Sequence, residues 1–229
     1  MPRGPRINIS GVIHHVINRG NNRQTVFKDE EDYRKYIGLL ERYKERYGFK
    51  LYTYVLMSNH VHLLIEAREK GSISKIMQGI TLAHTRYYNI KYKTSGHVWQ
   101  GRFKSPIVGE DRYLLEVSRY IELNPVRAGI VEKLEDYPWS SYATHASGKK
   151  NPLIEDHIYY ESLGNTKEER QARYSEFVKE GLKEKLMEIR QSVISGRGYG
   201  SEAYLQKVEE TIKARLRRGK RGRPKKKDV

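Results

Sequence analysis

Two histidines one residue apart, His60 and His62, are the first residues whose types and spacing could do chemistry. They begin an apolar segment that reads as a strand, in which alternation sends both imidazoles to one face and Val61 to the other. Two imidazoles on a rigid strand can bind one divalent metal ion. The chain has eight histidines, so the pair alone leaves two hypotheses open: a metal site, or two surface histidines.

A second group of residues recurs every four positions in the segment 111–124. Glu116, Tyr120 and Asn124 therefore share one face of a predicted helix, while an apolar stripe occupies another. A phenol one turn from an amide oxygen suits a nucleophile beside a metal ligand. The alternative is that Tyr120 is one more interfacial tyrosine, since the chain contains 18 of them.

The glycine-containing loop 96–104 combines aromatic and basic side chains. Trp99 and Phe103 could stack on unpaired bases while the guanidinium of Arg102 binds a phosphate. Alternatively, Trp99 packs the loop onto the sheet, as buried tryptophans often do.

The charge balance points to a polyanionic partner. The chain has 229 residues with 44 Lys and Arg against 28 Asp and Glu, a formal net charge of +16. Such an excess is costly unless a polyanion neutralises it, and nucleic acid is the first candidate. The segment 213–227 is rich in Lys and Arg and contains no acid, which predicts sequence-independent phosphate binding. Within it, Arg221 and Arg223 flank a glycine as in an AT-hook for the minor groove; a plain basic tail is the alternative.

Other features restrict the class of protein. Cysteine is absent, which excludes disulfides and thiolate sites and fits a reducing compartment. We find no signal-peptide pattern and no apolar run long enough for a membrane span. The sequence therefore predicts a cytoplasmic, nucleoid-associated protein with no membrane partner.

Hydrophobic periodicity predicts one compact α+β domain followed by helices. Strands are expected at 11–19, 49–57, 61–67 and 103–108, and helices at 29–47, 72–92 and 111–124, the last one capped by Asp111. This order matches a ferredoxin-like split βαβ antiparallel sheet, which we expect to carry its helices on one side. We place the catalytic domain at 1–146, a helical C-terminal extension at 147–217 and a basic tail at 218–229.

Four sequence blocks, in this order, resemble the single-tyrosine HUH transposases, most closely their REP-associated branch. The blocks are His15–Gly20, Leu56–His62, Gly96–Lys104 and Arg119–Gly129, and the resemblance covers roughly Gly11 to Tyr142. It implies that His60 and His62 are metal ligands, that Asn124 is a third ligand, and that Tyr120 is the nucleophile.

The resemblance also implies a function. We expect metal-dependent nicking and joining of single-stranded DNA through a 5′-phosphotyrosine, with Mg²⁺ or Mn²⁺, with palindromic hairpins as recognition elements, and with no nucleotide cofactor. A monomer is expected rather than a dimer. Two alternatives are a non-catalytic DNA-binding regulator of the same fold, and a replication initiator or relaxase, in which the tyrosine usually precedes the histidines. The expected DNA contacts are Arg19, Arg23, His97, Trp99, Gln100, Arg102, Phe103, Lys104, Arg119, Arg127, Arg221 and Arg223.

Overall fold

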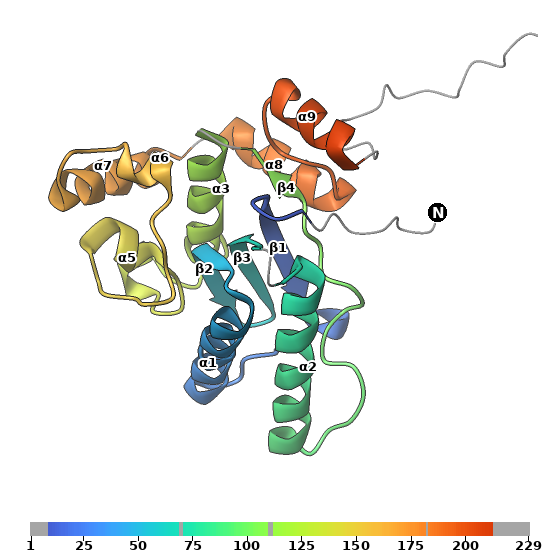
Figure 1. The fold of residues 1–229 in the computed structure, drawn as a ribbon. Coiled ribbons are helices and arrows are strands. Elements are labelled where there is room, and N and C mark those ends of the chain that lie inside the picture. Colours follow the sequence, from blue (N-terminus) through green and yellow to red (C-terminus); the bar gives the residue numbers. More distant parts are fainter. Residues whose placement is uncertain (1–8, 69–70, 110–111, 182, 213–229) are drawn as a thin grey trace, which may run out of the picture.

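A four-stranded antiparallel sheet forms the centre of the molecule (Figure 1). The computed structural model describes residues 9–68, 71–109, 112–181 and 183–212. Its strands are β1 (Ile13–Arg19), β2 (Lys50–Met57), β3 (His60–Glu66) and β4 (Ile107–Val108), in the spatial order β2-β3-β1-β4. This is the order of a ferredoxin-like sheet, so the predicted fold class is confirmed.

Helices of very different length surround the sheet. They are α1 (Glu30–Tyr47), α2 (Ile73–Tyr92), α3 (Arg112–Glu122), α4 (Asn124–Arg127), α5 (Tyr142–Ser147), α6 (Ile158–Glu161), α7 (Lys167–Glu180), α8 (Lys183–Ser195) and α9 (Glu202–Ile212). None of these described helices is long and apolar enough to cross a membrane.

Side-chain caps fix where the two long helices begin. The side chain of Asp29 accepts a hydrogen bond from the backbone of Asp32, whose own side chain accepts one from the backbone of Asp29. This reciprocal cap starts α1, and Gly48, with φ +62°, ends it. Ser72 caps α2 by accepting from the backbone of Lys75.

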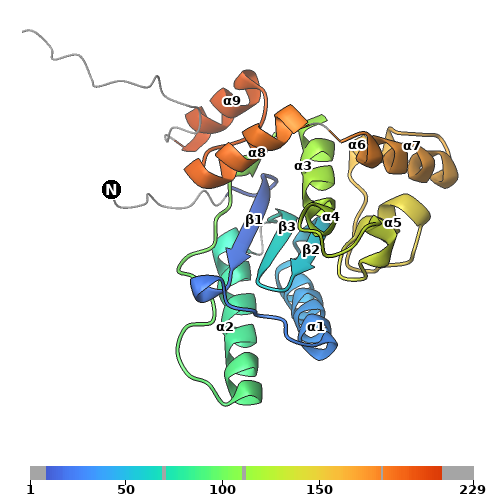
Figure 2. The ribbon, with the colours of Figure 1, turned by 180° about the vertical axis from the view of Figure 1, so that it is seen from behind.

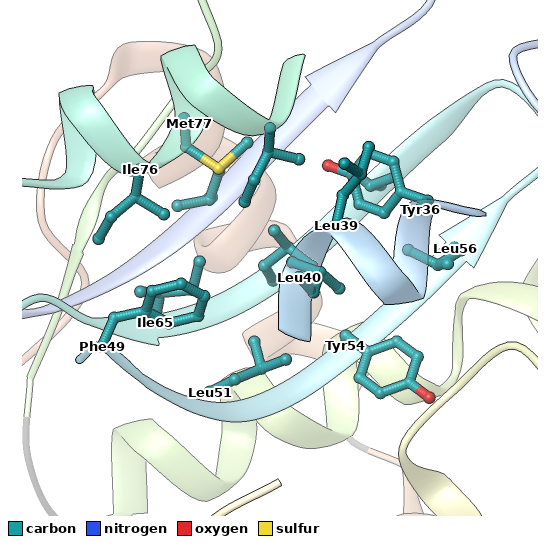
Figure 3. Packing of buried hydrophobic residues seen from close by; sticks show 14 of the residues in the cluster. Tyr36, Leu39, Leu40, Phe49, Leu51, Tyr54, Leu56, Ile65, Ile76 and Met77 are labelled. Atoms are coloured by element: carbon teal, nitrogen blue, oxygen red, sulfur yellow. The ribbon is translucent and has the colours of Figure 1, made fainter. Parts of the chain in front are cut away.

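Helices α1 and α2 cover one face of the sheet, which we call the α1/α2 face. Figure 3 shows Tyr36 and Leu40 of α1 and Ile76 of α2 packed over Leu51 and Ile65 of the strands. All five side chains are buried. Burial of this continuous apolar layer is the main stabilising contribution to the domain.

Helix α3 lies on the opposite face, which we call the α3 face (Figure 2). Val117 and Ile121 of α3 pack on Val55 and Leu64 of the strands. The expectation that the helices lie on one side of the sheet is therefore wrong. The physical reason is visible in β2, where every residue after Lys50 is buried, since a strand that is apolar on both faces must be covered on both.

The C-terminal helices extend the α3 side of the molecule. Helix α7 packs on α5, and α8 packs on α3. Over the described residues, the region predicted as a helical extension contains α6, α7, α8 and α9. Asp111, the basic tail and its Arg221 and Arg223 lie outside the described residues. The division into three segments stays a prediction.

Candidate active site

The histidine pair faces α3, as the alternation in β3 predicts. His62 is buried and His60 is half-buried, with ring centres 5.1 Å apart, while Val61 points into the apolar core of the other face. The two imidazoles therefore share one side of a rigid strand.

A third histidine, His15 of β1, completes this cluster. Its Nε2 lies 2.8 Å from Nδ1 of His62, and its ring centre lies 5.7 Å from that of Tyr120. His62 lies 6.0 Å from Tyr120 by the same measure. Sequence reasoning assigned no role to His15. Alternation along β1 places His15 on the same face as every second residue of that strand. This identifies it as a neighbour of His62 only once β1 is known to pair with β3.

These histidines are held neutral by burial. Burial lowers the pKa of His15 to about 3 and that of His60 to about 4. The pKa of His62 lies well below its ordinary value, because of burial and because His15, His60 and Arg127 are nearby. Neutral imidazoles keep a lone pair for a metal ion.

Hydrogen bonds orient the two candidate ligands. Nδ1 of His60 lies 2.6 Å from the amide oxygen of Asn59, which can only accept, so Nδ1 carries the proton and Nε2 keeps its lone pair. Nδ1 of His62 contacts Nε2 of His15, and this contact orients the His62 ring. Partners on the second ring nitrogen are typical of metal-binding histidines.

Tyr120 is presented to the histidines by the last turn of α3. Nη2 of Arg127 donates to the carbonyl of Tyr120 over 2.8 Å, and its guanidinium carbon lies 4.4 Å from the centre of the phenol ring. Nδ2 of Asn124 donates to the same carbonyl and to that of Ile121, each over 2.9 Å. Both side chains thus secure the end of the helix that carries the phenol.

The donor set fits a divalent ion in part. Two neutral, hydrogen-bonded imidazoles suit such an ion as two of its ligands. Among the described residues, no group of three or more His, Cys, Asp and Glu side chains is arranged to hold a metal. The role of Asn124 as third ligand, through its amide oxygen, stays a prediction.

A basic cavity of about 760 Å³ opens beside His60. It brings together residues predicted from separate parts of the sequence, namely Arg19, Arg23, Gln100, Arg102 and Lys104. Arg19 is fixed there because Nε and Nη2 both donate to Oε1 of Gln100, over 3.0 and 2.7 Å. Val193 and Ile194 of α8 form part of its wall. The cations of this cavity could bind the phosphates of a DNA strand next to the histidine pair.

Other predicted DNA contacts lie elsewhere. His97 and Phe103 line a second cavity, described below. Trp99 is 7% exposed and packs in the α1/α2 core, which favours the alternative that it fastens the loop to the sheet.

Arg119 is the prediction that the structure corrects. Its side chain is 3% exposed, its Nη1 donates to the carbonyl of Phe177 in α7, and its guanidinium lies over the Phe177 ring. It therefore joins α3 to α7 and does not line the basic cavity. Arg119 directly precedes Tyr120 in the sequence, but consecutive residues of a helix point to different sides of it. The Arg119 side chain therefore faces α7 and not the histidines.

Comparisons with known proteins agree with this fold. The family model described as "Transposase IS200 like" matches residues 8–124, which is half of the chain, and the chain belongs to this family.

Two proteins described as REP-associated tyrosine transposases are similar to this chain, and the sequence blocks resemble the same branch. A protein of Haemophilus influenzae described as a REP-associated tyrosine transposase is 31% identical over 109 residues, which is 43% of this chain and 61% of that protein. The solved structure of a REP-associated tyrosine transposase bound to a REP hairpin matches with a TM-score of 0.56 at 19% identity, over 69% of this chain and 93% of that one. At this identity the structural match shows the fold.

Proposed function

We propose that this protein cleaves and rejoins single-stranded DNA beside palindromic hairpins, with Tyr120 as the nucleophile. The observation that carries the proposal is the contact of the Tyr120 ring with His15 and His62, next to a cavity lined by arginines. The matching solved structure is described as bound to a REP hairpin, which supports the same class of DNA for this chain.

His60 and His62 would hold Mg²⁺ or Mn²⁺, with Asn124 as a third ligand. The ion would polarise the scissile phosphate and orient it for in-line attack. Because imidazole suits Mn²⁺ better than Mg²⁺, we expect Mn²⁺ to support the reaction at least as well.

The reaction needs no nucleotide cofactor. The phenol oxygen of Tyr120 forms a bond to phosphorus, the bond from phosphorus to the 3′ oxygen breaks, and the phenol proton ends on the departing 3′-hydroxyl. A 5′-phosphotyrosine links protein and DNA. Another 3′-hydroxyl reverses the step, reforms a phosphodiester and returns the proton to Tyr120.

Arg127 is placed to assist this step. It lies against the phenol ring, and within the described part of the chain its Nε and Nη1 atoms have no hydrogen-bond partner. A guanidinium with two unused donors can bind two oxygens of a phosphate. We therefore assign Arg127 to the phosphate attacked by Tyr120.

One chain supplies the histidines, the tyrosine and the basic cavity, which supports a monomer as the working unit. Its site of action would be the chromosome, in the cytoplasm. A non-catalytic DNA-binding regulator is the alternative that the following experiment separates.

The test uses labelled single-stranded oligonucleotides from palindromic repeats flanking the gene, with Mg²⁺, Mn²⁺ or EDTA. We expect a covalent protein–DNA adduct that needs metal and is absent in Tyr120→Phe. Tight DNA binding without adduct or nick under any metal would refute catalysis and leave the binding protein. An adduct that persists in Tyr120→Phe would show that another residue is the nucleophile.

A further inference from the structure

A second cavity, of about 440 Å³, lies between α2 and the loop 97–103. It shares Asn18, Gly101 and Arg102 with the basic cavity beside His60. We infer that it receives one unpaired nucleobase of the strand whose phosphates lie in the basic cavity, and so contributes to sequence preference. This inference rests on the proposed function.

A bulge in the edge of the sheet creates the connection between the two cavities. The segment 98–108 runs antiparallel beside β1, with backbone hydrogen bonds from Gln100 to Arg19 and, in both directions, between Lys104 and Ile17. Between these two hydrogen-bonded positions, β1 contributes one residue, Asn18, and the opposing segment contributes three, residues 101–103. Gly101, with φ +57°, allows the turn. Because bulges redirect side chains, residues 101 and 102 border both cavities.

The walls of the second cavity suit a base. One stripe of α2 contributes hydroxyl, amide and methyl groups, and the loop contributes two aromatic residues. The lining residues used here are Gln78, Thr81, Leu82, Thr85, Trp99 and Phe103. Its volume falls in the range of roughly 300–1,000 Å³ typical of small-ligand sites, which combine apolar walls with a few polar groups. A base can stack on aromatic or apolar walls while its edge bonds to the amide and hydroxyls.

Two buried polar groups on this cavity have unused hydrogen-bonding capacity. Asn18 is 2% exposed, and its Oδ1 has no partner among the described residues. The indole Nε1 of Trp99 is likewise buried without a partner in the described ranges. Buried polar atoms without partners are rare in folded proteins, and they occur where a ligand or water completes the bonds. Asn18 and Trp99 both line this cavity, and a nucleobase, which donates and accepts hydrogen bonds, has the groups that these two atoms lack.

The neighbouring charges restrict the choice of ligand. The shared residue Arg102 and the cations of the adjoining cavity favour a ligand that is covalently joined to phosphate. A free apolar molecule would gain nothing from them. The combination selects a nucleotide within a strand, with its base on the α2 side and its phosphate on the histidine side.

An abasic scan tests the inference. Binding of the single-stranded oligonucleotide from the flanking repeat is measured in EDTA, with each base in turn replaced by an abasic residue. We expect one position near the cleavage site whose loss weakens binding to the wild type by about tenfold or more, since one stacked base contributes that much. A flat scan would overturn the inference.

Filling the cavity provides the second half of the test. Thr85→Phe places a ring in the cavity, and Ile90→Phe, at an exposed position of the same helix, is the matched control. We expect Thr85→Phe to bind the intact strand about tenfold more weakly and to lose its sensitivity to the critical abasic position, while the control keeps both. Gln78→Phe, at an exposed lining position, repeats the test without disturbing the core.

The outcomes separate this inference from the proposed function. If the wild type forms the Tyr120 adduct but Thr85→Phe and Gln78→Phe behave as Ile90→Phe does, the base pocket is wrong and the enzyme remains. If the wild type binds no single-stranded DNA, both the proposed function and the base pocket fail. Photocrosslinking of a 5-iodouracil placed at the critical position should label residues of α2 or of the loop 97–103. Labelling confined to other segments would contradict the inference.

Discussion

The two faces of the sheet are buried to a similar extent but are built from different chemistry. The α1/α2 face is an apolar and aromatic layer. The α3 face contains hydrogen-bonded polar pairs under the helix, such as Thr53 with Ser118 at 2.8 Å and Glu116 with Tyr199 at 2.6 Å. Apolar packing is non-directional, whereas hydrogen bonds require defined geometry. The first face therefore contributes mainly stability, and the second fixes how α3 is rotated.

Glu122 illustrates this difference most clearly. Its carboxylate accepts hydrogen bonds from Ser141 at 2.6 Å and Tyr174 at 2.8 Å, and lies 2.9 Å from Nδ1 of His145. All four residues are buried. A carboxylate with this many partners holds one orientation of the helix, because any rotation would leave buried groups unpaired. The phenol of Tyr120, two residues earlier, is thereby kept facing the histidines.

The largest effect is expected on the α3 face, from His60→Ala. Removing one of two candidate ligands should lower the rate of adduct formation by about a hundredfold or more. Because His60 is only half-buried, the urea midpoint of unfolding should change little. Adduct yield over time and urea denaturation measure the two quantities. Adduct formation within threefold of the wild type would remove His60 from the site.

The converse change on the α1/α2 face is Leu40→Ala. Leu40 is fully buried in the apolar cluster. Its truncation should lower the free energy of unfolding by about 2–5 kcal/mol, through lost burial and the cavity left behind. Adduct formation by the folded protein should be close to that of the wild type. If Leu40→Ala is fully folded but forms the adduct much more slowly than the wild type, the two faces are not functionally distinct.

His84 is a polar side chain within the α1/α2 core, and its contribution to stability depends on pH. It is fully buried among Phe27, Tyr36 and Trp99, and burial lowers its pKa from 6.5 to about 4. The unfolded chain therefore binds the proton more readily, and this group reduces stability as pH falls from about 6.5 towards 4. At pH 5 the loss should be about 2 kcal/mol.

The variant His84→Phe removes this titration and keeps a ring of similar size. We expect its stability to fall less than that of the wild type between pH 7 and pH 5, as measured by urea denaturation at both values. Equal losses in the two proteins would mean that His84 does not titrate in this range.

The smallest effect is expected at the rim of the basic cavity. Arg23 is exposed and lines that cavity, so Arg23→Ala should weaken single-stranded DNA binding only a few-fold and lower the salt slope by about 0.7. Arg42→Ala, an exposed arginine on α1, is the matched control and should leave the slope unchanged. Identical slopes for both variants would place the DNA away from this cavity.

Local patterns predicted much of this fold. The positions of α1 and α2 and the alternation around Val61 all depend on neighbours within a few residues, and the structure confirms each of them. The face on which α3 packs was predicted wrongly. Helical periodicity shows that α3 has an apolar stripe but not which side of the sheet receives it.

The candidate site also contains residues that the sequence predicted correctly and residues that it did not. His60, His62 and Tyr120 were noticed by residue type and spacing and were assigned roles by the family resemblance, and the structure brings them together. His15 was missed and Arg119 was assigned to the wrong surface. Both errors concern contacts between residues far apart in the chain, namely His15 with His62 and Arg119 with Phe177.

The sequence by itself determined the order of the elements, the shared face of the histidine pair and the basic character of the chain. These follow from short-range periodicity and from composition. Only the tertiary structure decided that α3 lies opposite α1 and α2, that His15 joins the site, and that a bulge at 101–103 opens two connected cavities. Those features depend on pairing between distant segments, which the spacing of residues along one strand or helix does not encode.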